Sequence, residues 1–260
     1  MIKRSYELTR IMGIPIRVHI TLIILLLFAA FSYGVMGLLI AVGVFASVAL
    51  HELGHSWVAV RKGCQVREIM LLPIGGVAKM SHIPSHPKDE ALIAAAGPAV
   101  SFLLAVLFWL LIGGGVASQF FLHLSAINLM LCLFNLLPSF PMDGGRIFRA
   151  FMTPRIGRLK ATALAARIGR IMAVAFGIYG LLTGQFMLML IALFIYNAAG
   201  AEYRSVVAQH MNQEWFTTEQ QADVHVSPPP YARKAPSGWK EWQKKTNAFF
   251  NDLFRYRDEG

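Results

Sequence analysis

Two histidines and a glutamate stand in this chain at a spacing that suits metal chemistry. His51 and His55 are four positions apart in the sequence HELGH, and Glu52 directly follows the first histidine. On an α-helix, side chains four positions apart lie on the same face, so both imidazoles can reach one metal ion. Glu52 can then reach a water molecule at that metal and act as a general base. The spacing predicts a hydrolytic zinc site.

The motif is embedded in an unusually apolar sequence. Of the 260 residues, 56% are hydrophobic and 15% are charged, and the mean hydropathy is +0.53. Soluble domains carry about 25% charged residues, so this composition indicates a multi-pass membrane protein. Ionisable side chains inside a membrane are costly and usually functional. We therefore expect HELGH to form a functional site within a membrane-spanning helix.

Apolar segments define the predicted fold class, an all-α polytopic membrane protein with about six transmembrane helices. Crossing a bilayer takes about 20 residues. The predicted spans are residues 18–33, 35–60, 91–113, 118–138, 165–183 and 186–201. Residues 64–80 are too short and too interrupted to span, with Pro73 and the pair Gly75 and Gly76 at their centre. They predict a short membrane-associated β-hairpin, with an ordinary cytoplasmic turn as the alternative.

The net charge of +10 is distributed as a topology signal. Lys and Arg occur before the first span, in 61–90, in 146–170 and after residue 201, and none occurs in the other predicted turns. In a six-span chain these four regions share one side, which the positive-inside rule assigns to the cytoplasm. We expect both termini and the opening of the active site on that side. The lipid bilayer is an expected partner and nucleic acid is not, because no aromatic-basic module accompanies the charge.

A catalytic zinc ion usually has three protein ligands, so a third is needed. Between residues 91 and 201, Asp143 is the only acidic residue and His123 the only histidine. Asp143 lies at the cytoplasmic end of the fourth predicted span, at the depth expected for HELGH, whereas His123 lies near the opposite face. Pro138 and Pro141 break the helix, so Asp143 can be presented sideways. The alternative is an aspartate that caps the next helix.

Asn135 precedes this aspartate on the same predicted span. Its amide suits a hydrogen bond to the substrate backbone or to an oxyanion, and contact between helices is the alternative. Residues 1–201 are predicted to form the membrane core and residues 202–260 a cytoplasmic tail. The tail has a Pro-rich linker followed by an aromatic and basic stretch, which fits either an amphipathic helix or a poorly ordered end.

Taken together, these motifs resemble the site-2 protease family of intramembrane zinc metalloproteases. The shared features are HELGH on a membrane helix, PIGG in the hairpin, the pair Gly97-Pro98 and NLLPSFPMDGG at 135–145. The chain looks closest to the compact six-span members, similar to the sporulation factor protease. Ser101 departs from the family, since many relatives have Asn there, and neither a PDZ insertion nor a CBS domain is evident.

The resemblance implies one catalytic Zn²⁺ held by His51, His55 and Asp143, with Glu52 as the catalytic acid and base. It also implies that the hairpin, with Gly75 and Gly76, helps to bind an extended substrate strand.

The function predicted is a zinc-dependent intramembrane endopeptidase. Its substrates would be membrane proteins cut in or beside a transmembrane segment, in regulated intramembrane proteolysis, in a prokaryotic cell membrane. A proteolytically silent adaptor or chaperone of the same fold is the alternative, and a zinc transporter is a weaker one because spans three, five and six lack acidic residues. The sequence assigns no oligomeric state.

Overall fold

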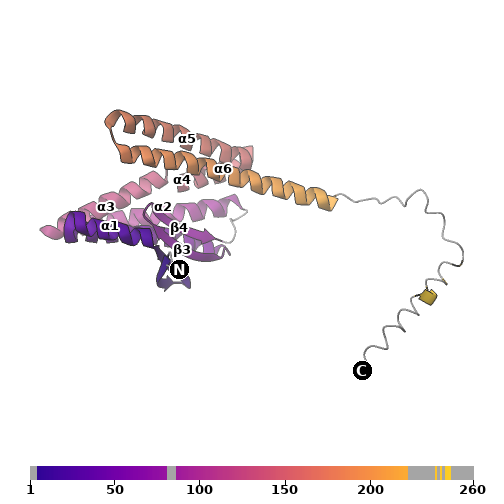
Figure 1. Cartoon of the computed structure of the whole chain (residues 1–260), viewed down its shortest axis with the longest axis horizontal. Coiled ribbons are helices and arrows are strands. Elements are labelled where there is room, and N and C mark those ends of the chain that lie inside the picture. Colours follow the sequence, from indigo (N-terminus) through magenta and orange to yellow (C-terminus); the bar gives the residue numbers. More distant parts are fainter. Residues whose placement is uncertain (1–4, 81–85, 222–237, 239–240, 242–243, 247–260) are drawn as a thin grey trace, which may run out of the picture. The chain divides into compact units, whose positions relative to one another are not determined.

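Apolar helices make up most of the molecule, and a small sheet stands beside them (Figure 1). The computed structural model describes residues 5–80, 86–221, 238, 241 and 244–246. The chain divides into two compact units, residues 1–211 and 212–260. The helices of this unit are α1 Ile20–Arg61, α2 Pro87–Leu110, α3 Val116–Asn135, α4 Asp143–Ile156, α5 Arg158–Thr183 and α6 Phe186–Gln221, of which α6 runs on past residue 211.

Five of these helices, all but α4, are long and apolar enough to cross a membrane. Helix α1 contains both of the first two predicted spans, because Gly34 has a non-helical φ of 66° and ψ of −160° and bends the helix there. Leu22 in the first arm and Leu53 in the second pack against the same apolar cluster, which a straight helix would not allow. The fold class predicted from the sequence is thereby confirmed.

Large apolar side chains cover the outward faces of these helices. Phe31 in α1 is 92% exposed and Leu182 in α5 is 80% exposed. Such surfaces are unfavourable in water and match the hydrocarbon of a bilayer. The exposure therefore agrees with a multi-pass membrane protein.

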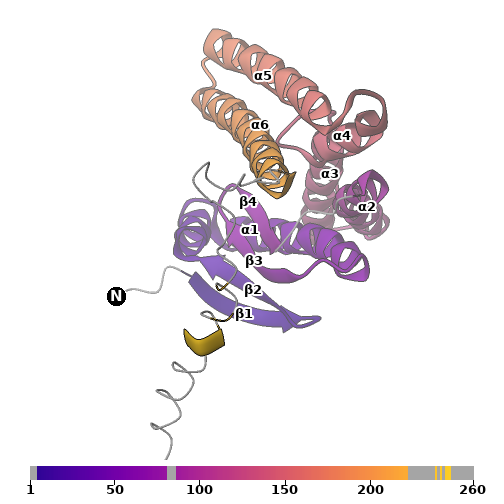
Figure 2. The same cartoon turned by 90° about the vertical axis from the view of Figure 1, so that its right-hand side faces the viewer.

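A four-stranded sheet lies alongside α1, as Figure 2 shows. Its strands are β1 Ser5–Ile11, β2 Ile14–His19, β3 Val66–Leu72 and β4 Gly75–Met80, in the order β1-β2-β3-β4. The middle pair, β2 and β3, is parallel and both outer pairs are antiparallel. Strand β2 alternates buried and half-buried residues, so Ile14, Ile16 and Val18 face the apolar cluster beside α1.

The predicted hairpin is present as β3 and β4, but the strands before the first helix were not anticipated. The sequence implies a helix directly after Asp143 only in the alternative in which this aspartate caps it, whereas the structure shows α4 as a separate helix. Helix α5 accordingly begins at Arg158, seven residues before the predicted span. Helix α4 packs on both α2 and α5.

Helix α6 continues through residue 201, where the predicted core ends, to Gln221. The division into a core of 1–201 and a tail of 202–260 stays a prediction. The predicted Pro-rich linker and most of the predicted amphipathic stretch lie outside the described residues.

Candidate metal centre

The HELGH motif lies near the end of α1, on its second arm. His51 and His55 are 4% and 5% exposed, so both imidazoles are removed from solvent. Their Nε2 atoms are 3.1 Å apart, as expected for residues one helical turn apart on one face. Two ring nitrogens therefore point to a common centre.

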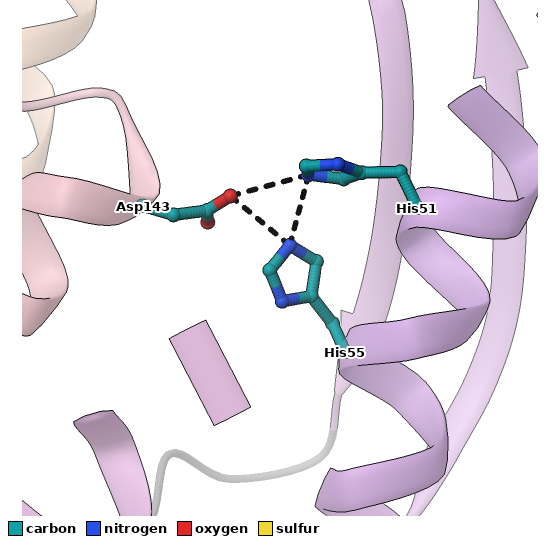
Figure 3. A group of neighbouring side chains, drawn as sticks. All are labelled: His51, His55 and Asp143. Atoms are coloured by element: carbon teal, nitrogen blue, oxygen red, sulfur yellow. Dashed lines mark hydrogen bonds and ion pairs between the residues drawn. The ribbon is translucent and has the colours of Figure 1, made fainter. Parts of the chain in front are cut away.

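Asp143 comes to this centre from the start of α4. Its Oδ2 lies 3.2 Å from Nε2 of His51 and 3.1 Å from Nε2 of His55, and Figure 3 shows the three side chains facing one another. The possible ligand atoms of this group all lie within 4.8 Å of one another. Asp143 does not act as the cap of α4, because the capping position is Met142.

The turn before α4 fixes where Asp143 stands. Helix α3 ends at Asn135, and the backbone N–H of Met142 donates to the carbonyl oxygen of Ser139 over 3.0 Å. Gly145 lies directly on this turn, since a Cβ atom there would be 2.6 Å from the carbonyl carbon of Ser139. Glycine thus lets the first turn of α4 pack against the preceding backbone.

Helix α2 holds both imidazoles from behind. Nδ1 of His51 is 2.8 Å from Oγ of Ser101, and Nδ1 of His55 is 2.7 Å from the carbonyl oxygen of Ile93. Gly97 lies between these two residues, and a Cβ atom there would collide with the Nε2 atoms of both histidines. Helix α2 runs on through Pro98, and the glycine before it gives room to the imidazoles.

The arrangement fits a zinc ion. Each histidine uses Nδ1 for a protein partner and keeps Nε2 for the centre, which is how metal-binding histidines are usually oriented. Two imidazoles and one carboxylate form a common catalytic zinc ligand set.

Glu52 lies beside the hairpin. A Cβ atom on Gly76 would be 2.5 Å from Cγ and 3.2 Å from Oε1 of Glu52, so strand β4 passes directly over this side chain. Gly75 opens the same strand with a φ of 137°, a conformation that favours glycine. The hairpin and the expected general base are therefore neighbours.

Asn135 is the last residue of α3, and its side-chain nitrogen donates to the carbonyl oxygen of Leu131 over 3.0 Å. Within the described part of the chain, no hydrogen bond joins it to the histidines or to Asp143. Its expected contact with a substrate stays a prediction.

Ser101 and the Ile93 carbonyl were not recognised as parts of the site from the sequence. Ser101 was noted only as a departure from the family pattern. The spacing of Ile93, Gly97 and Ser101, four residues apart each time, places them on one face of α2. This spacing is the feature of the sequence that could indicate their common position facing the histidines.

Comparison with known proteins gives matches over most of the chain. Residues 39–120 and 113–176 match peptidase family M50. A zinc metalloprotease of Methanocaldococcus jannaschii is 42% identical over 216 residues, 78% of this chain and 61% of that protein. Stage IV sporulation protein FB of Bacillus subtilis is 29% identical over 161 residues, 60% of this chain and 56% of that protein.

A solved structure is similar as well. The site-2 protease from Methanocaldococcus jannaschii shares 40% sequence identity and a TM-score of 0.62, over 76% of this chain and 95% of that one. The chain spans about three fifths of the length of the two curated relatives.

Proposed function

This chain belongs to peptidase family M50, and on that premise we propose that it is a zinc-dependent endopeptidase that cuts membrane proteins in or beside a transmembrane segment. The proposal rests on one observation: the side chains of His51, His55 and Asp143 lie together in the interior, where they could hold one metal ion. Glu52 follows the first histidine in the sequence. Two further observations support the proposal: the similar protein of Methanocaldococcus jannaschii is named a zinc metalloprotease, and five helices of the described residues are long and apolar enough to cross a membrane. The position of the cut and the roles of the individual residues belong to the same proposal.

The three ligands have the role of holding zinc, and Glu52 has the role of moving protons. When bound, zinc supplies Lewis acidity to a water molecule and to the scissile carbonyl. Glu52 accepts a proton from the attacking water and returns it to the amine of the leaving segment. The Nδ1 contacts of the histidines, to Ser101 and the Ile93 carbonyl, keep both rings aimed at the centre.

A substrate helix has to be unwound before it is cut, because its carbonyls are hydrogen-bonded within the helix. Strand β4 is at an edge of the sheet and is adjacent to Glu52 through Gly76. An extended substrate segment that pairs with this edge would present its backbone to the general base. Gly75 and Gly76 would then contact the substrate backbone, and Asn135 would donate a hydrogen bond to it.

The orientation proposed puts both termini and the opening of the site in the cytoplasm of a prokaryotic cell. The described turns support it, since residues 111–115 and 184–185 carry no Lys or Arg. Water would then reach the centre from the cytoplasm.

The test uses the purified full-length chain reconstituted in lipid vesicles with a single-span membrane protein. Glu52→Gln should abolish cleavage and leave the zinc content unchanged, whereas His51→Ala should lose both. Glu7→Gln, in an exposed carboxylate on β1, is the matched control and should cut normally.

Cleavage by Glu52→Gln at the rate of the unmodified chain would overturn the assignment. Binding of the single-span protein without any cutting by the unmodified chain would favour an adaptor. An unfolded soluble polypeptide, offered in parallel, separates hydrolysis from helix unwinding.

A further inference from the structure

A buried arginine stands apart from the metal centre on the same short helix. Arg149 is six residues after Asp143 on α4, and only 1% of its side chain is exposed. Burying a guanidinium is costly unless its charge is paired and its N–H groups are hydrogen-bonded. The groups that pair with Arg149 therefore indicate its role in the structure.

The partners of Arg149 come from two other helices. Its Nε donates to Oε1 of Glu90 on α2 over 2.8 Å, and its Nη2 makes a second short contact with the same oxygen. Its Nη1 donates to Oε1 of Glu202 on α6 over 2.9 Å. The guanidinium also lies 4.8 Å over the ring of Phe140, in the turn before α4. All three nitrogens of the group therefore have a carboxylate partner.

Glu90 is the most important of these partners because of where it lies on α2. It is 5% exposed and three residues before Ile93, whose carbonyl holds His55. Gly97 and Ser101 follow on the same side of α2. The ion pair therefore joins the helix that orients the histidines to the helix that begins at Asp143.

Helix α4 depends on such contacts for its position. It has 14 residues and starts after a turn that contains two prolines, and isolated helices of this length are marginal. A slide of α4 along α2 would move Asp143 away from the imidazoles. Two charge-assisted hydrogen bonds from a buried guanidinium to one buried carboxylate oxygen resist such a slide better than apolar packing, which tolerates small shifts.

We propose that Glu90 and Arg149 are positioning residues that fix α4 on α2 and so place Asp143 between His51 and His55. This inference rests on the proposed function, in which those three residues hold zinc. It adds a buried ion pair outside the HELGH and Asp143 motifs that sets zinc affinity without touching the metal or the substrate.

The experiment measures zinc affinity of the full-length protein by chelator competition, with the absorption spectrum of the Co²⁺-substituted protein and the Tm of the metal-free protein alongside. The test variant is Glu90→Leu with Arg149→Met, which removes both charges and leaves neither buried alone. We expect its Kd for zinc to rise about tenfold or more, as is typical when support of a metal ligand is lost. The Co²⁺ spectrum should change with it.

The matched control removes a neighbouring ion pair of α2. Asp89 is next to Glu90 in sequence and pairs with Lys62 at the end of α1 over 2.8 Å, on the half-exposed side of the helix. Asp89→Leu with Lys62→Met should leave the Kd and the Co²⁺ spectrum unchanged.

A Kd equal to that of the unmodified chain would overturn the proposal, and a lower Tm alone would show that the pair only stabilises the fold. If the double variant yields no folded protein, Glu90→Asp decides: it should weaken zinc binding while Asp89→Glu does not. Failure of His51→Ala to weaken zinc binding would instead contradict the proposed function, whatever the ion-pair variants do.

Discussion

At the scale of single residues, the two histidines of HELGH are held by chemically different partners. His51 contacts a hydroxyl, that of Ser101, and His55 contacts a main-chain carbonyl, that of Ile93. A carbonyl only accepts, so it requires a proton on Nδ1 of His55 and leaves Nε2 free for the metal. A hydroxyl can donate or accept, so Ser101 constrains the orientation of His51 more than its tautomer.

Ser101→Ala should therefore weaken zinc binding without unfolding the protein. Loss of a hydrogen bond behind a metal-binding histidine costs about tenfold to a hundredfold in affinity. Chelator competition on the purified protein measures it. Ser125→Ala is the control, because Ser125 of α3 donates to the Ala105 carbonyl of α2 over 2.8 Å, away from the site. An unchanged Kd in Ser101→Ala would show that the hydroxyl does not support His51.

Residue types and spacing predicted the three side chains of this centre, but not the residues of α2 that contact the histidines. The spacing of His51 and His55 and the isolation of Asp143 among apolar residues singled out the group that the structure brings together. Nothing in the sequence says which residue of a third helix faces a given imidazole, because that depends on how α2 packs against α1. Ser101 and Gly97 were visible in the sequence, but their contacts arise only from that packing.

At the scale of elements, the hairpin comes very close to the HELGH helix at Gly76 and Glu52. Gly76 of β4 is so near Glu52 that any larger residue must displace one of them. The hairpin therefore restricts where the carboxylate of Glu52 can stand. This couples the strand proposed to bind substrate with the group proposed to move protons.

Gly76→Ala should lower the cleavage rate and leave zinc binding intact. The added methyl would lie 2.5 Å from Cγ of Glu52, so the carboxylate must move. Misplacing a catalytic group by about 1 Å can cost a hundredfold in rate. Initial rates on the vesicle substrate measure the effect. Gly114→Ala, in a turn with open space around it, is the control and should keep its rate. Equal rates in the two variants would contradict the predicted coupling.

Only half of the sheet could be predicted from the sequence. Strands β3 and β4 were predictable because Pro73 and the two glycines interrupt an apolar run between them. Strand β2 pairs in parallel with β3, although all of α1 separates the two strands in the sequence, and among the described residues β1 pairs with β2 alone. Pairing between segments so far apart in the chain leaves no local pattern beyond a few alternating residues. Helix α4 is also hard to predict, because its sequence contains glycine and proline, which disfavour a helix.

At the scale of the whole molecule, the apolar helices and the charge pattern argue for one orientation. Five helices can cross a membrane, and α1 is bent at Gly34 into two arms. The arms reproduce the two spans read from the sequence, although the first, with 14 residues from Ile20 to the bend, is about 21 Å long and shorter than a hydrocarbon core. The direction in which the helices cross is the part that only the distribution of Lys and Arg predicts.

Single cysteines test that direction. We expect Gly114→Cys, in the exposed turn between α2 and α3, to react with a membrane-impermeant maleimide on intact cells. Lys160→Cys, exposed in the first turn of α5, should react only after permeabilisation. The two natural cysteines give little background: both Cys64 and Cys132 are buried, and burial also raises the pKa of the Cys64 thiol, so less of the reactive thiolate is present near neutral pH. The reverse labelling pattern would place the opening of the active site on the outside of the cell and contradict the proposed orientation.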